Sequence, residues 1–177
     1  MTMAHQMKKR LIALTAALLL PAASHASLFD AVTLSAGWSD DFDTPFRIGL
    51  RGDTDYRWFD SGTGYLSANY ELALSRFADS VRPATAISLS PVLTYNFKTS
   101  TRFEPFVEFG IGLSWFSEKN IGQSESGSHF QFEDRLGAGF RIGAHDWTLR
   151  YIHYSNAGFE EPNDGLDLVM LNYGYRF

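Results

Sequence analysis

Phe103-Glu-Pro-Phe-Val-Glu-Phe-Gly-Ile-Gly-Leu-Ser-Trp-Phe116 has a strict two-residue pattern that indicates the fold of the chain. Every odd-numbered position of this stretch is apolar, whereas most even-numbered positions carry Glu, Gly or Ser. Successive side chains of a β-strand point to opposite faces, so the pattern predicts a strand with one wholly apolar face. Residues 84–97 repeat the pattern, with apolar side chains at the odd positions from Ile87 onward.

The same period of two runs through the rest of the chain beyond residue 30, and no helical stripe competes with it there. Eight segments with this period can be drawn: 31–39, 45–58, 64–76, 84–97, 103–116, 129–142, 146–156 and 166–177.

The connections between these segments alternate in length. Residues 59–63, 98–102 and 143–145 form short connections, whereas 117–128 and 157–165 are longer. Bacterial outer-membrane barrels have an even number of strands, short periplasmic turns and longer outer loops. The expected fold class is therefore all-β, an eight-stranded antiparallel transmembrane β-barrel of outer-membrane type. Both chain termini would then lie at the periplasmic end.

The first segment of the chain has the features of a secretory signal peptide. Lys8, Lys9 and Arg10 precede the apolar run Leu11–Leu20, and Ser24-His-Ala26 has the small-x-small pattern of a cleavage site. The apolar run is too short to span a bilayer, which takes about 20 apolar residues. We therefore expect a signal peptide over 1–26 and a single barrel domain over 27–177.

Composition excludes several classes of function. The 177 residues include no Cys, which excludes a disulfide framework, a Cys-ligated zinc site and a cysteine nucleophile. The net charge of −5 argues against nucleic-acid binding, which normally needs a basic face. We expect no cofactor, no metal site and no nucleic-acid partner.

The less apolar face of the strands carries charges of both signs. A closed barrel of eight strands is narrow enough for side chains to fill it, and charges inside it need partners. We therefore expect a plugged lumen closed by ion pairs. The residues on this face are Arg47, Arg51, Glu71, Glu104, Glu108, Glu133, Arg135, Arg141 and Arg150.

A soluble, lipocalin-like barrel with an apolar interior is the alternative. The chain ends Leu171-Asn-Tyr-Gly-Tyr-Arg-Phe177, with an apolar residue at every second position. This ending resembles the C-terminal assembly signal of bacterial outer-membrane barrels. Together with the export signal, it favours the membrane barrel.

One acid interrupts the apolar face of residues 129–142. Asp134 shares its parity with Phe132 and Leu136, so it would face lipid in a regular strand. Two interpretations stay open, namely a β-bulge that turns the side chain inward and a functional acid.

A constellation with hydrolytic chemistry lies near the last long connection. His153 and Ser155 continue the lipid-facing parity of Trp147, Leu149 and Tyr151. Polar groups are costly there unless they have partners or a function.

Asp167 shares the outward parity on the next segment. If the connection 157–165 is symmetric, Asp167 lies opposite His153, with about 4.5–5.5 Å between opposed Cβ atoms. Acid, imidazole and hydroxyl then stand in the order that nucleophilic hydrolysis needs. Ser155 would be the nucleophile, His153 the base and Asp167 the orienting acid. A His and a Ser without chemistry at the membrane boundary are the alternative.

The oxyanion of such a reaction needs hydrogen-bond donors. The side chain of Asn156, with the backbone N–H of Ala157 or Gly158, is the candidate donor set.

Three segments carry a resemblance to a known family. Phe132-Glu-Asp-Arg-Leu-Gly-Ala-Gly-Phe140, Ile152-His-Tyr-Ser-Asn-Ala-Gly158 and Pro162-Asn-Asp-Gly165 resemble the signature segments of the PagL family of lipid A 3-O-deacylases. The resemblance implies an eight-stranded outer-membrane barrel that removes the 3-position acyl chain of lipid A with a Ser–His–acid triad. His153 and Ser155 match the base and the nucleophile of the family.

The acid departs from the family pattern. The family usually has Glu where this chain has Asp167, which is one methylene shorter. Either the strands approach more closely here, or a loop acid serves instead, with Glu160, Glu161 and Asp164 as candidates.

The resemblance also implies where the protein is located and which molecules it binds. It implies lipid A of lipopolysaccharide as the substrate, in the bacterial outer membrane, with the active site facing the outer leaflet, and it allows a homodimer. A non-enzymatic small barrel and a lipid A acyltransferase are the alternative functions.

Overall fold

The computed structural model describes residues 27–41, 43–79 and 82–177. The expected signal peptide over 1–26 lies outside the described residues, so its cleavage stays a prediction. No helix in the described ranges is long and apolar enough to cross a membrane. The strands are β1 (Ala31–Trp38), β2 (Pro45–Trp58), β3 (Gly64–Phe77), β4 (Ala84–Phe97), β5 (Phe103–Phe116), β6 (Asn120–Ile121), β7 (Ser124–Glu125), β8 (Phe130–Ile142), β9 (His145–Ser155) and β10 (Leu166–Arg176).

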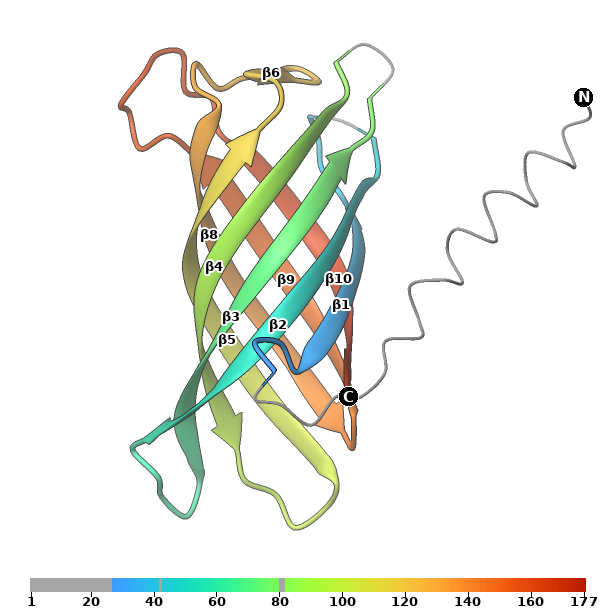
Figure 1. Ribbon diagram of the computed structural model, residues 1–177, viewed down its shortest axis with the longest axis vertical. Helices are drawn as coiled ribbons and strands as arrows, with labels where there is room; N and C mark the ends of the chain where they lie inside the picture. The colour runs from blue at the N-terminus through green and yellow to red at the C-terminus, as the bar shows by residue number, and fades with distance from the viewer. Residues whose placement is uncertain (1–26, 42, 80–81) are drawn as a thin grey trace, which may run out of the picture.

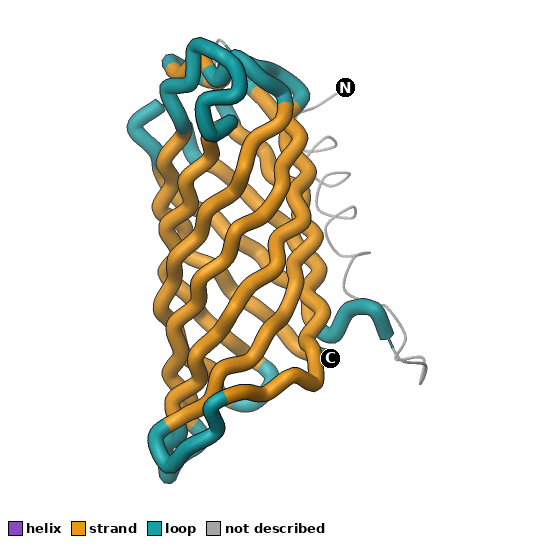
Figure 2. Tube along the Cα trace, turned by 90° about the vertical axis from the view of Figure 1, so that its left-hand side faces the viewer, coloured by secondary structure: helices purple, strands orange, loops and turns teal. Residues whose placement is uncertain are grey.

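Eight of these strands close into one barrel in the order β1-β10-β9-β8-β5-β4-β3-β2. All neighbours are antiparallel, including β1 and β10, which close the barrel. The strands wind around the barrel with a common tilt, and the connections gather at its two ends (Figures 1 and 2). The expected fold is confirmed, and the predicted strand ends differ from the observed ones by at most one residue.

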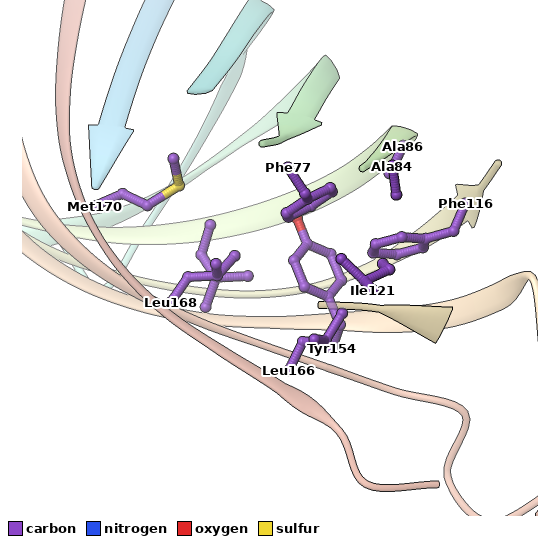
Figure 3. Close-up of a cluster of buried hydrophobic side chains, with 10 residues drawn as sticks. Phe77, Ala84, Ala86, Phe116, Ile121, Tyr154, Leu166, Leu168 and Met170 are labelled. Carbon is purple, nitrogen blue, oxygen red and sulfur yellow. The ribbon is translucent and has the colours of Figure 1, made fainter. Parts of the chain in front are cut away.

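The longer connections lie at one end of the barrel, opposite the C-terminus (Figure 1). One of them contains a small hairpin, β6–β7, that the sequence pattern did not predict. Its Ile121 has an exposed fraction of 0% and inserts into the barrel mouth. There it joins an apolar cluster with Phe77, Phe116 and Tyr154 (Figure 3).

Ion pairs fill the lumen below this cluster. Arg47 Nη1 lies 2.8 Å from Glu133 Oε2, and Arg150 Nε lies 2.6 Å from Glu108 Oε1. Arg135 contacts Glu133 as well. These side chains are buried, and their opposite charges neutralise one another inside the barrel, as expected. Glu104 differs, because its side chain is 52% exposed beside Arg141.

The outer surface of the barrel is apolar. Side chains such as Leu34, Ile87, Phe109, Leu136 and Leu171 point outward and are exposed. The soluble alternative predicted the reverse, with an apolar interior and a polar exterior. The observed arrangement is that of a barrel with lipid around it and a polar interior.

Candidate active site

The candidate site lies on the outer wall of the barrel, at the end that carries the long connections. Tyr151, His153 and Ser155 point to the outside of β9, because the inward positions between them hold the buried Ile152 and Tyr154. The side chain of His153 is 35% exposed.

His153 and Asp167 face each other across β9 and β10. They are register partners, as the symmetric connection predicted. His153 Nδ1 lies 2.7 Å from Asp167 Oδ1. The hydroxyl of Tyr151 donates a second hydrogen bond to the same oxygen, at 2.5 Å. Asp167 therefore occupies the position of an acid that fixes the ring of His153.

Two of the competing loop acids, Glu160 and Asp164, contact other groups. Glu160 is near Lys119, with 3.7 Å between Oε2 and Nζ. Asp164 Oδ2 accepts a hydrogen bond of 2.9 Å from the backbone N–H of Glu125. Among the described residues, only Asp167 forms a hydrogen bond with the side chain of His153.

Ser155 stands two residues beyond His153 on the same face, about 6.6 Å away at Cα for a regular strand. Within the described part of the chain, Ser155 Oγ has no hydrogen-bond partner. Catalytic hydrogen bonds are often long in a substrate-free site and shorten when substrate binds. Because Nδ1 of His153 is bonded to Asp167, its Nε2 atom is left for the Ser155 hydroxyl and a substrate.

Gly165 provides space for the imidazole. Its backbone has a φ of 76°, and a Cβ placed there would lie 2.8 Å from Cε1 of His153. Only glycine combines this left-handed conformation with so close an approach. Sequence reasoning did not identify Gly165 as a site residue, although it ends the quoted Pro162–Gly165 segment.

The expectation for the side chain of Asn156 was wrong. Its exposed fraction is 1%, and its Nδ2 donates to the carbonyls of Ser126 and Glu160. Its Oδ1 accepts the backbone N–H of Gly158 at 2.9 Å. Asn156 therefore organises the loop, and neither its amide nor the N–H of Gly158 is free for an oxyanion.

Two other donors near Ser155 are free. Among the described residues, the N–H of Ala157 has no acceptor, and Ala157 has a left-handed φ of 54°. Residues held in such conformations cluster at functional sites. Asn163 accepts the backbone N–H of Asn156 through its Oδ1, which leaves the Nδ2 of Asn163 without an acceptor in the described ranges.

The β6–β7 hairpin anchors the loop that carries these groups. Ser124 Oγ donates to the carbonyl of Gly165 at 2.7 Å. The backbone N–H of Asp164 donates to the carbonyl of Glu125 at 3.1 Å. The β6–β7 hairpin at the barrel mouth therefore also holds the loop between β9 and β10.

An open recess of about 420 Å³ is lined by Asp167 and Val169 of β10 and by Trp38 of β1. Trp38, Asp41 and Asp164 are among its lining residues. Burial raises the pKa of Asp41 above its ordinary value, and the negative charges of Asp167, Asp40 and Asp164 raise it further. The recess therefore places unfavourable negative charges close together.

Asp134 faces outward, which excludes the β-bulge, one of the two interpretations that the sequence left open. Its pairing is continuous with Ile111 on β5 and with His153 on β9. Regular pairing keeps it on the face of Phe132 and Leu136. The imidazole of His153 therefore has a carboxylate on each neighbouring strand, Asp134 on β8 and Asp167 on β10.

Comparisons with known proteins agree with this architecture. The family model described as "Lipid A 3-O-deacylase (PagL)" matches residues 42–176. The lipid A deacylase PagL of Pseudomonas aeruginosa is 34% identical over 145 residues, covering 80% of this chain and 83% of that protein. The lipid A deacylase PagL of Bordetella bronchiseptica is 38% identical over 157 residues, covering 82% of this chain and 83% of that protein.

A solved structure shows the same fold. The crystal structure of the outer membrane enzyme PagL matches with a TM-score of 0.80 and 32% sequence identity, covering 83% of this chain and 99% of that one. The resemblance of the signature segments is thereby confirmed. This outer-membrane barrel belongs to the lipid A 3-O-deacylase (PagL) family.

Proposed function

We propose that this protein hydrolyses the ester that links an acyl chain to the 3-position of lipid A. The observation that carries the proposal is the 2.7 Å hydrogen bond between His153 Nδ1 and Asp167 Oδ1, beside a serine on the same outward face. Family membership gives the substrate class. The geometry supports the residues that we propose to act on it.

Ser155 is the nucleophile in this mechanism. Its Oγ attacks the ester carbonyl carbon while Nε2 of His153 takes the hydroxyl proton. The C–O bond to the sugar then breaks, and His153 returns the proton to the departing sugar oxygen. A water molecule attacks the acyl-Ser155 ester with His153 again as base, which releases the free acid and restores the serine.

The supporting groups act on charges that develop during the reaction. Asp167 holds the tautomer with its proton on Nδ1 of His153 and stabilises the imidazolium. The hydroxyl of Tyr151 fixes the carboxylate of Asp167. The N–H of Ala157 and the Nδ2 of Asn163 are the free donors for the oxyanion, and loss of one such donor typically costs about 10²–10³ in rate.

The location of the site suits a substrate in the outer leaflet. The end with the long connections would face the cell exterior, as in other barrels of this kind. Lipid A then reaches an outward-facing site sideways from the membrane, without entering the lumen. Its acyl chains would lie along Leu149, Val169 and Leu171, which point outward below the site.

The test is a mass spectrum of lipid A from cells with and without the protein. Loss of one 3-linked hydroxyacyl chain in cells that carry it supports the esterase. Unchanged lipid A would indicate a barrel without this activity. A gain of an acyl chain elsewhere would indicate a transferase that passes the chain from Ser155 to another alcohol.

A further inference from the structure

Ser124 of β7 is a buried residue to which the proposed mechanism gives no role. It belongs to the connection between β5 and β8, and its exposed fraction is 3%. Its Oγ donates a hydrogen bond of 2.7 Å to the backbone carbonyl of Gly165, 41 residues away along the chain. In the described ranges, no other group donates to this carbonyl. Because Gly165 is also buried, loss of the hydroxyl would leave its carbonyl without a partner and away from water.

Gly165 in turn lies against the imidazole of His153. Its φ of 76° is left-handed, and a Cβ at this position would lie 2.8 Å from Cε1 of the ring. Cε1 stands between the two ring nitrogens. Nδ1 is bonded to Asp167, and Nε2 is the atom left for Ser155. The backbone of Gly165 therefore limits how the imidazole can turn between the acid and the hydroxyl.

The hairpin that carries Ser124 is fixed from inside the barrel. Ile121 of β6 and Leu166, the residue that follows Gly165, belong to the same buried apolar cluster at the barrel mouth (Figure 3). Their exposed fractions are 0% and 1%. Removal of apolar side chains of this size from water stabilises the arrangement that buries them. Ser124 is thus attached to a packed support on one side and to Gly165 on the other.

The two residues after Ser124 hold other parts of the β9–β10 loop. The backbone N–H of Asp164 donates to the carbonyl of Glu125 at 3.1 Å, and the N–H of Glu125 donates to Asp164 Oδ2 at 2.9 Å. The carbonyl of Ser126 accepts a hydrogen bond of 2.9 Å from Nδ2 of Asn156. Of these three hairpin residues, Ser124 is the one that bonds to Gly165, beside the imidazole.

We propose that Ser124 is a positioning residue for the hydrolytic reaction. Its hydrogen bond holds the backbone of Gly165 against His153, and this contact keeps Nε2 of the ring directed toward Ser155. Ser124 is buried and acts through Gly165, without contact to the reacting atoms. This inference rests on the proposed function. It extends the groups that serve the reaction from the outer wall of β9 and β10 to the hairpin at the barrel mouth.

The expected effect follows from the sensitivity of such reactions to alignment. A displacement of about 1 Å that is caused by a remote change can lower a rate about 10²-fold. Loss of one neutral hydrogen bond loosens the contact without releasing the whole loop, so kcat should fall by about 3- to 30-fold. KM should change little, because the outward side chains that would hold the acyl chains, Leu149, Val169 and Leu171, are unaltered.

Ser124→Ala removes the hydroxyl, and Ser126→Ala is the matched control. Ser126 lies in the same connection with an exposed fraction of 2%, and its Oγ has no hydrogen-bond partner within the described part of the chain. Both substitutions remove one buried oxygen, but only Ser124→Ala removes a hydrogen bond. Ser124→Thr keeps a hydroxyl on Cβ and should restore most of kcat. Initial rates on purified lipid A in detergent micelles, measured at several concentrations, give kcat and KM.

A second measurement reports on His153 without turnover. In protein labelled with ¹³C at the histidine Cε1 atoms, the NMR signal of this ring is assigned by its absence from His153→Ala. Ser124→Ala should shift or broaden that signal, whereas Ser126→Ala should leave it in place. His145, at the opposite end of β9 from Ser155, is the internal reference, and its signal should move in neither variant.

Three results would overturn the inference. If Ser124→Ala and Ser126→Ala both keep the unaltered kcat and the His153 signal does not move, the hydrogen bond does not position the ring. An equal loss of kcat in both variants would indicate a general effect of altering this connection. A change confined to KM would indicate a contact with the substrate instead.

Failure of the proposed function is a separate outcome. If the unaltered protein leaves lipid A intact while Ser124→Ala still moves the His153 signal, the proposed function is refuted and the contact from Ser124 to His153 is supported. If Ser124→Ala does not form a folded barrel, Ser124→Cys takes its place, because a thiol is a weak donor. It should show a smaller loss of kcat with the same movement of the signal. Unchanged kcat and an unmoved signal in Ser124→Cys would overturn the inference.

Discussion

His153 and Asp167 are partners in the β9–β10 register, and their side chains are joined by a hydrogen bond of 2.7 Å on the outside of the barrel. The relationship explains how a chain with the shorter acid can keep the geometry of the proposed triad. Directly opposed strand positions bring the two Cβ atoms close enough for an aspartate to reach Nδ1. A glutamate is not needed for contact.

Asp167→Asn should lower kcat by about 10²–10⁴ with little change in KM, because the amide cannot stabilise the imidazolium. Asp167→Glu should keep substantial activity. Initial rates on purified lipid A at several concentrations separate the two parameters. If Asp167→Asn is nearly silent while Asp164→Asn is inactive, the orienting acid is in the loop instead.

Gly165→Ala should reduce activity strongly without unfolding the barrel. The new methyl group would push the imidazole of His153 away from Ser155, since the ideal Cβ lies 2.8 Å from Cε1. Gly143 is the matched control, because its φ of 60° is also left-handed but, chain neighbours aside, no atom of the described residues lies within 4 Å of an added Cβ. Activity of Gly165→Ala equal to that of Gly143→Ala would contradict this role for the glycine.

Glu133→Gln should destabilise the barrel, because it breaks the ion pairs of Glu133 with Arg47 and Arg135 and leaves both arginines to share Glu71 inside the lumen. Breaking a buried ion pair typically costs about 3–5 kcal/mol. Urea unfolding in lipid vesicles measures the change. Glu104→Gln is the control, since its exposed pair with Arg141 should contribute only about 0–1 kcal/mol. Similar unfolding midpoints for both variants would show that the lumen pairs contribute little.

Asp41→Asn should stabilise the protein at neutral pH. Burial and the neighbouring carboxylates raise the pKa of Asp41 in the folded state, so its ionised form opposes folding above its ordinary pKa. That cost is relieved as the pH falls and Asp41 takes up a proton. Thermal unfolding of both proteins should therefore differ at pH 7 and converge near pH 3. A stabilisation that persists at pH 3 would point to a cause other than charge.

The barrel could be predicted from the sequence because its physics is local and periodic. Alternation in stretches such as Phe103–Phe116 fixes which side chains face lipid, and strand ends follow from where alternation stops. The opposition of His153 and Asp167 followed from the same parity and a symmetric connection. The β6–β7 hairpin was missed because two-residue strands carry no period.

The parts of the site that could not be predicted depend on tertiary contacts. Asn156 looked like a free donor beside Ser155, but its side-chain amide donates to the carbonyl of Ser126, which belongs to a distant connection. Gly165 matters because an added Cβ would lie too close to His153. No local sequence pattern reveals this contact. Asp134 was left between two interpretations, since a strand pattern alone does not exclude a bulge.

The proposed esterase activity is tested most sharply by a mass spectrum of lipid A after incubation with purified protein. Beside the unaltered protein, Ser155→Ala and His153→Ala are assayed as folded barrels. We expect the unaltered protein to remove one hydroxyacyl chain from the 3-position and each variant to leave lipid A intact. Triad members act as a unit, so the double variant should be little worse than either single one. Removal of that chain by Ser155→Ala at the unaltered rate would show that Ser155 is not the nucleophile.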